Sequence, residues 1–290
     1  MKNDSNKEFL LRTILFNNRL DSYESYLSYA VEHGYILTSF IDYLENPAYD
    51  NKKIMILRHD IDRSVEVARL MFLIEKRHRA KATYYFRWDT FDKQFIDELI
   101  SAGFEVGLHY ETLSAYCTKN SIQVVDKEIL SICKEQLKRE IQLFNEKTGA
   151  KIKTVCSHGS PENRQLHVSN NVLLEDENYK DFDIKCEAYD RSFYTKVDVH
   201  IMDADILNNY GFAYHSNPTK SIKDGKKLIV FLSHPAHWKL NHLQRMIRLV
   251  KFTLGMYTTN TTRVFKRIDI SGLRDTKQEF ASESVINLGN

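Results

Sequence analysis

The sequence predicts an α/β protein in which parallel strands alternate with helices. From residue 53 onward, short apolar runs rich in β-branched and aromatic residues alternate with longer segments that carry apolar residues at helical spacing. Only 4 prolines and 10 glycines occur, and no Gly/Ser-rich or Pro-rich linker divides the chain. Repeated strand–helix units imply parallel strands with helices outside, so we expect one main domain over residues 51–275.

The first 50 residues are predicted to form a helical extension. Segments 7–16, 20–33 and 37–45 carry apolar residues at helical spacing. Because this part holds few candidate catalytic groups, we expect it to be a packing layer or a lid against the main domain.

Three strands and two helices are predicted in the first part of the main domain. The strands are KIMILRH (53–59), ATYYFR (82–87) and FEVGLH (104–109). Helix 64–77 follows the first strand and has an amphipathic pattern. Helix 90–103 follows the second and ends at Gly103, the residue type favoured just past a helix.

The second part of the domain continues the pattern less regularly. A long helix over 126–147 ends near Gly149 and leads into the strand TVCSH (154–158). The segment 163–181 is predicted to be a loop. Further strands are IKCEAY (184–189), VDVHIM (197–202) and LIVFLSH (228–234), followed by a closing helix over 237–254 and a tail over 276–290.

Composition and charge restrict the function classes. Hydrophobic residues make up 42% and charged residues 28%, as in a globular protein, and the net charge of +2 gives no general argument for a nucleic-acid partner. No run of eighteen apolar residues and no signal-peptide core occur, so we expect no membrane span and a cytoplasmic location. The four cysteines form no CxxC pair, which favours reduced thiols.

Ionisable side chains recur where the predicted strands end. They are Asp60 and Asp62 after the first strand, Arg87 after the second, His109 after the third, His158 after a later one and His234 after the last. In parallel α/β folds the active site lies at the carboxyl ends of the strands. We therefore expect these groups to converge on one rim.

These residue types suit a divalent metal. Asp60 and Asp62 are two apart, so on an extended backbone they point the same way. Carboxylates and imidazoles together form a ligand set for zinc, or for iron, nickel or cobalt. A catalytic site needs about three protein ligands and an open position for water, which leaves one Asp as general base and a His as general acid.

Three motifs resemble those of the polysaccharide deacetylases, carbohydrate esterase family four, with the NodB-homology fold. They are RHDID (58–62), GFEVGLHYETL (103–113) and FLSHPAHW (231–238), and the resemblance covers roughly residues 53–240. It implies a distorted (β/α) barrel and a metal-dependent hydrolase that removes an N-acetyl or O-acetyl group from a sugar without a covalent intermediate. Zn²⁺ is the expected ion.

The resemblance also implies roles for individual residues. His109 is a metal ligand, and His234 is the catalytic acid. Asp60 is assigned as base and Asp62 as metal ligand, with the opposite assignment left open. The family's second metal histidine falls at Leu113 in this chain.

A second departure lies in the family's third motif, which is replaced by CSHGSP (156–161). We infer that His158 from this altered motif supplies the missing imidazole ligand.

Five further residues are candidates for contact with substrate. They are Arg87, Trp88, Tyr110, His237 and Trp238. The aromatic ones could stack on a sugar, although Trp238 could instead pack in a helix. His237 could be a second acid, a ligand or a structural residue.

For Arg87 two interpretations stay open: it could keep the base carboxylate ionised, or it could pair with Asp89 or Asp92. For His59 we favour a core position over a ligand role, and for His215 a loop position over the site.

The leading hypothesis is a deacetylase acting on a nucleotide- or lipid-linked precursor of a surface polysaccharide. Two alternatives remain: a C–N hydrolase acting on a non-sugar amide, and an inactive relative that binds a glycan or a partner protein. The lost second histidine motivates the last of these. No GxxxxGK[ST] motif occurs, which excludes a P-loop nucleotide enzyme.

Overall fold

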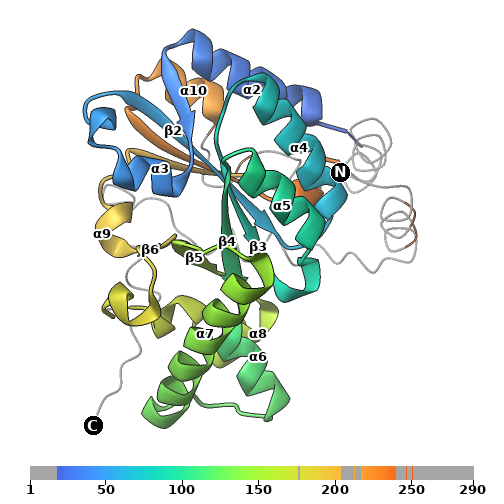
Figure 1. The fold of residues 1–290 in the computed structure, drawn as a ribbon, viewed down its shortest axis with the longest axis vertical. Coiled ribbons are helices and arrows are strands. Elements are labelled where there is room, and N and C mark those ends of the chain that lie inside the picture. The colour runs from blue at the N-terminus through green and yellow to red at the C-terminus, as the bar shows by residue number, and fades with distance from the viewer. Residues whose placement is uncertain are drawn as a thin grey trace, which may run out of the picture.

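The computed structural model describes residues 18–175, 177–203, 212, 217–239, 246 and 250, and it is built around one parallel sheet (Figure 1). The strand order is β6-β5-β4-β3-β2-β8-β7, with β1 also paired to β2. The strands are β1 Tyr35–Thr38, β2 Lys53–Ile61, β3 Thr83–Phe86, β4 Glu105–Tyr110, β5 Thr154–Ser157, β6 Cys186–Glu187, β7 Val199–Met202 and β8 Leu228–Ser233.

The strand order is that of an opened barrel. From β2 the strands follow chain order through β3, β4 and β5 to β6, and on the other side β7 and β8 lead back to β2. All these pairs are parallel, and no pairing joins β6 to β7 in the described part of the chain. The sheet is therefore a curled half-barrel, and the predicted distorted (β/α) barrel is confirmed.

The connecting helices are α2 Leu20–Glu32, α3 Phe40–Glu45, α4 Val65–Arg77, α5 Lys93–Ser101, α6 Thr112–Lys119, α7 Lys127–Thr148, α8 Pro161–Leu166, α9 Arg191–Tyr194 and α10 Pro218–Lys223. Of these, α2, α4, α5 and α7 begin and end close to where the sequence predicts, and α9 and α10 were not predicted. Asp126 caps α7 by accepting a hydrogen bond from the Ile129 backbone N–H at 2.9 Å. Gly103 and Gly149 follow α5 and α7 with φ of +72° and +68°, which glycine adopts without strain.

The N-terminal segment is not purely helical, which corrects the prediction of a helix from residue 37. Residues Tyr35–Thr38 form β1, which pairs with the first half of β2, and α3 begins only at Phe40. The apolar YILT sequence is buried at three of its four positions and completes the sheet beside β2, which outweighs its helical spacing. The predicted segment 7–16 lies outside the described residues.

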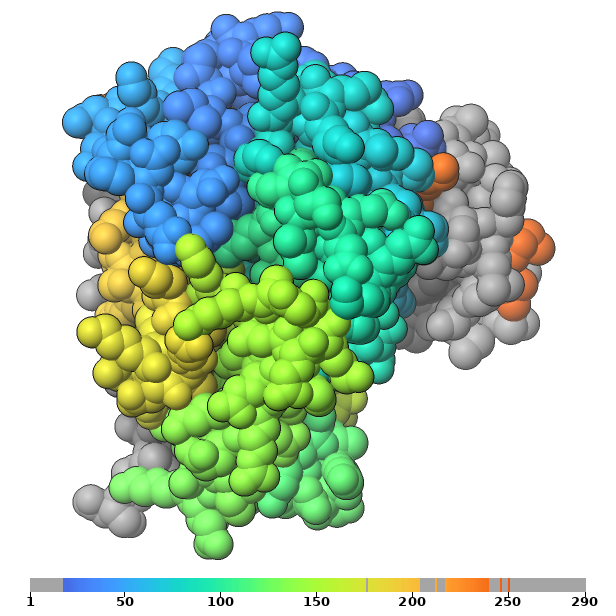
Figure 2. Space-filling model, in the orientation of Figure 1, coloured from blue at the N-terminus to red at the C-terminus, as the bar shows by residue number. Residues whose placement is uncertain are grey.

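Helix α3 joins the N-terminal segment to the far end of the sheet. Phe40 packs against Phe193 of α9 with ring centroids 4.9 Å apart, and Lys153 pairs with Glu45 at 2.8 Å. Figure 2 shows this blue segment directly against the yellow one that contains α9. The described part of this segment, residues 18–50, thus contributes to the main body of the fold.

Two further segments differ from the prediction. The expected loop over 163–181 contains α8 and the short 3-10 helices η3 Asn170–Leu173 and η4 Tyr179–Phe182, and helix α6 was not predicted. Where the closing helix was predicted to start, the structure has the 3-10 helix η7 Pro235–His237 followed by a turn; most of the predicted helix and the tail 276–290 lie outside the described residues. No described helix is both long enough and apolar enough to span a bilayer.

Candidate metal centre and active site

Side chains from the ends of three strands, β2, β4 and β5, meet at the carboxyl edge of the sheet. Asp62 follows β2, His109 lies in β4 and His158 follows β5. Asp62 Oδ1 lies 3.3 Å from His109 Nε2 and 3.1 Å from His158 Nδ1, and the two nitrogens are 3.2 Å apart. These three atoms form a nearly equilateral triangle.

The size of this triangle matches a zinc coordination shell. Zinc bonds of 2.0–2.1 Å in tetrahedral geometry place neighbouring ligand atoms about 3.3–3.4 Å apart. The three atoms need to move by only a few tenths of an ångström to bind one ion, and a tetrahedral shell then leaves one position open.

Protonation also favours a cation at this point. His109 Nδ1 lies 3.0 Å from the backbone oxygen of Cys156, so Nδ1 carries the proton and donates it. In neutral His109 the bare Nε2 then faces the carboxylate of Asp62, whose buried Oδ1 has no hydrogen-bond partner. Two lone pairs this close repel each other unless a proton or a metal cation lies between them, and a backbone carbonyl is a usual outer partner of a metal-bound histidine.

Packing explains why residue 113 is not a ligand. Leu113 lies in the first turn of α6 and is fully buried in the hydrophobic core. His158 instead reaches the triangle from the next strand, where its backbone N–H donates to the Tyr110 carbonyl at 2.8 Å. The arrangement supports the inference that His158 supplies the second imidazole.

Asp60 lies beneath the triangle in a bidentate ion pair. Arg58, two residues earlier on the same face of β2, donates from Nε and Nη2 to the two Asp60 oxygens at 2.9 and 2.7 Å. Asp60 is only 2% exposed, and its Oδ2 lies 3.7 Å from His109 Nε2. Burial alone would raise the pKa of Asp60, but the charge of Arg58 outweighs it and lowers the pKa.

Arg87 does not pair with Asp60, whose partner is Arg58, but with two other carboxylates. Its guanidinium forms a bidentate pair with Glu111 at 2.9 and 3.0 Å and lies 3.4 Å from Asp89. Of the two interpretations left open, the structure supports pairing with Asp89, with Glu111 as the main partner. Asp92 instead caps α5 by accepting from the Phe95 N–H.

Cys156 lies between the arginine and the carboxylate. Its Sγ is 2.7 Å from Arg58 Nη2 and 3.7 Å from Asp60 Oδ2. Burial raises the pKa of the Cys156 thiol well above its ordinary value, so the thiol stays protonated and is a poor metal ligand.

His234 directly follows β8 on the same rim and is oriented by Asp203, which follows β7. Asp203 Oδ1 accepts from His234 Nδ1 at 2.7 Å, and Oδ2 accepts from the His234 backbone N–H at 2.8 Å. Burial lowers the pKa of His234, but Asp203 and then Asp60 and Asp62 raise it to about 9. The imidazole is therefore a proton donor near neutral pH.

Sequence reasoning missed Arg58 and Asp203, although both carried a signal. Arg58 is two residues before Asp60, the spacing that places strand residues on one face. Asp203 directly follows the strand VDVHIM, so the strand-end rule that selected His234 applies to it equally.

The aromatic candidates differ in exposure. Trp238 is 0% exposed, and its Nε1 donates to Asp203 at 2.6 Å. Tyr110 is 1% exposed. Neither presents a ring face to solvent, so their burial gives no support to sugar stacking. Trp88 is half-buried and packs against Phe91.

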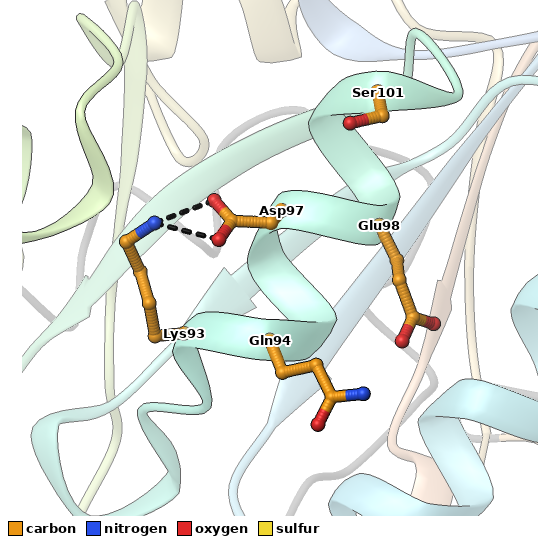
Figure 3. A pocket seen from close by; sticks show the side chains of 5 residues that line it. All are labelled: Lys93, Gln94, Asp97, Glu98 and Ser101. Carbon is orange, nitrogen blue, oxygen red and sulfur yellow. Dashed lines mark hydrogen bonds and ion pairs between the residues drawn. The ribbon is translucent and has the colours of Figure 1, made fainter.

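Two further histidines, His59 and His215, were expected to lie outside the site. His59 is fully buried and its Nε2 lies 2.6 Å from Glu75, the expected core position. His215 lies outside the described residues. A hollow on the outer side of α5, shown in Figure 3, carries none of the strand-end groups; it is lined by Lys93, Gln94, Asp97, Glu98 and Ser101.

Comparisons with known proteins give matches among solved structures. The sequence matches no protein-family model and no curated protein. The wild-type form of a CE4 family pseudoenzyme from Bacillus anthracis is 16% identical, with a TM-score of 0.38 over 70% of this chain and 62% of that one. The chain thus spans less than two thirds of the length of that protein.

Two other solved structures are similar to this chain at lower sequence identity. IcaB from Ammonifex degensii is 14% identical, with a TM-score of 0.40 over 58% of this chain and 74% of that one. The peptidoglycan deacetylase PdaC from Bacillus subtilis is 13% identical, with a TM-score of 0.32 over 72% and 98%.

Proposed function

We propose that this protein is a metal-dependent hydrolase that removes an acetyl group from a sugar or a sugar-linked precursor of a surface polysaccharide. The observation that carries the proposal is the triangle of Asp62, His109 and His158, with a buried carboxylate and a protonated imidazole beside it. A divalent ion held there would lower the pKa of water and polarise an acyl carbonyl.

The other groups divide the proton transfers between them. Asp60 is kept ionised by Arg58, and its carboxylate oxygens retain lone pairs that can accept a proton from the attacking water. His234 holds a proton on each nitrogen near neutral pH and delivers one to the departing amine. Asp203 holds the His234 ring in place and stabilises its charged form.

The substrate class rests on the motif resemblance, and the site chemistry is compatible with it. Hydrolysis of an amide needs a nucleophile, a base and an acid on the leaving nitrogen, and Asp60 and His234 supply the last two. Half-buried Arg87 and Glu111 pair with each other at the rim, and this partial exposure supports a contact with polar groups of a substrate.

The proposal is tested by metal analysis combined with a screen for acetate release from acetylated nucleotide sugars. We expect close to one zinc-type ion per chain. Asp62→Ala and the double variant His109→Ala/His158→Ala lose it, whereas Asp60→Asn retains the ion and loses acetate release. Asp89→Asn, which changes an exposed carboxylate near the rim, is the matched control and keeps both.

Different results would refute different parts of the proposal. Metal retained in both ligand variants would refute the ligand set. Metal binding without acetate release from any acetylated sugar would favour the inactive glycan- or partner-binding protein. Release from simple amides alone would favour the C–N hydrolase.

A further inference from the structure

A second set of metal-capable atoms lies around Asp203. Its Oδ1 is 2.7 Å from His234 Nδ1 and 3.2 Å from His237 Nδ1, and the three groups place one ligand atom each within 4.8 Å of one another. Two imidazoles and a carboxylate are the donor set of many zinc sites. No described residue of the first triangle belongs to this set.

The local backbone presents both rings to the same oxygen. His234 and His237 flank the 3-10 turn η7, and residues three apart on a 3-10 helix lie on the same side. Pro235 begins the turn, and the His237 backbone N–H donates to the His234 carbonyl at 2.8 Å. The spacing of the two imidazoles is therefore built into the HPAH sequence.

The carboxylate is oriented in advance as well. Asp203 Oδ2 is occupied by the His234 backbone N–H and by Trp238 Nε1 at 2.6 Å. Oδ1 is thus directed at the two imidazoles, and the buried Asp203 has no freedom to turn away. The two rings are partly exposed, with side-chain exposures of 19% and 24%, so an ion can reach them from solvent.

We propose that Asp203, His234 and His237 form a second divalent-cation site, for an ion of the zinc class, which switches the enzyme off when it fills. The ion takes the place of the two Nδ1 protons, which are released to solvent, and no electron transfer is involved. With the ion on Nδ1, the His234 ring keeps only its Nε2 proton, and giving up that proton would leave an imidazolate. The ring is then no longer the imidazolium acid that the reaction needs. The inhibitory consequence rests on the proposed function; the binding site itself does not.

The two sites are expected to fill in order. At the first triangle, an ion displaces the one hydrogen bond between His158 Nδ1 and His109 Nε2 and none from Asp62 Oδ1. At the second, an ion must displace two N–H···O bonds to Asp203. The second site therefore binds more weakly and fills only when free metal is in excess.

The test is equilibrium dialysis of the full chain against Zn²⁺, with Co²⁺ absorption spectra as an independent readout. We expect two ions per chain at saturation. His237→Gln removes the weaker site and leaves the tighter one, and Asp62→Ala does the reverse. His78→Gln is the control, since His78 also lies beside a carboxylate, Glu24 at 3.2 Å, but at an ordinary surface pair, and it keeps both ions.

Activity gives the second arm of the test. Excess zinc is expected to suppress acetate release by at least tenfold in the wild type and by much less in His237→Gln, each relative to its own rate at one equivalent. A single ion per chain at every zinc concentration, or equal isotherms for wild type and His237→Gln, would overturn the second site. Because binding is measured without turnover, an inactive protein would refute the proposed function and leave this result standing.

Discussion

At the scale of single residues, the candidate site depends on charges that compensate one another in a buried setting. Arg58 and Asp60 are 1% and 2% exposed, and neither would be stable as a lone buried ion. Tyr189 lies over the guanidinium, with its ring centroid 4.3 Å from Arg58 Cζ. The pair thus secures the ionised state of the carboxylate that we assign as base.

Arg58→Met should therefore lower stability and activity together. The variant leaves Asp60 buried without its partner, and breaking a buried pair in this way costs about 3–5 kcal/mol. The pKa of Asp60 should rise, so the loss of stability at pH 7 should shrink at acidic pH, where the carboxyl becomes neutral. Urea unfolding at several pH values measures this.

Arg69→Met is the matched control for Arg58→Met, because Arg69 pairs with Glu98 in a half-exposed setting. Its cost should stay within about 1 kcal/mol. Equal losses of unfolding free energy in the two variants would show that breaking the buried Arg58–Asp60 pair costs no more than breaking a half-exposed one.

Asp203→Asn should move the alkaline limb of the pH–rate profile to lower pH. Asp203 is the strongest of the groups that raise the pKa of His234 to about 9, and the amide removes that charge while keeping an oxygen. The acid must be protonated to act, so activity is lost as pH rises through its pKa. In the variant, the midpoint of this alkaline limb should lie about one pH unit or more below that of the wild type. An unchanged limb would mean that His234 is not the titrating acid.

At the scale of elements, the strands were predictable because apolar β-branched runs and strand-end charges give strong local signals. Asp62, His109 and His158 were identified in this way, and the structure brings them together. Helix α6 was missed because it is short, and β1 was misassigned because its pairing with β2 is a tertiary effect. Arg58 and Asp203 were missed because they act through Asp60 and His234, although the strand spacing of Arg58 and the strand-end position of Asp203 pointed to them.

The close approach of β3, β4 and β5 at Gly107 gives a prediction at this scale. A Cβ at Gly107 would lie 2.6 Å from the Thr154 backbone oxygen and 2.5 Å from the Tyr85 ring. Gly107→Ala should therefore cost about 1–3 kcal/mol, as overpacking between strands does. It should also weaken metal binding, because His109 lies two residues further along β4.

Gly159→Ala is the control for Gly107→Ala, since a Cβ there meets nothing within 4 Å. Its stability should lie within about 0.5 kcal/mol of the wild type. Thermal or urea unfolding of the two variants decides the point, and a Gly107→Ala protein as stable as Gly159→Ala would contradict the packing argument.

At the scale of the whole molecule, the three candidate ligands come from the ends of β2, β4 and β5. Asp62 and His158, the two that are furthest apart in the sequence, are separated by 96 residues. An ion bound there joins distant parts of an opened barrel, and it binds only the folded chain. Metal binding and global stability should therefore be linked.

Zn²⁺ should raise the melting temperature of the protein, and this rise should require Asp62, His109 and His158. A ligand at a concentration 100 times its Kd stabilises the native state by about 2.7 kcal/mol, which corresponds to about 5–10 °C for a chain of this size. Chelation should reverse the shift. At one equivalent of Zn²⁺, which fills only the tighter site, His158→Ala should abolish the shift and His78→Gln should retain it. Calorimetry with and without Zn²⁺ measures the effect, and a shift that survives in His158→Ala would place the stabilising ion elsewhere.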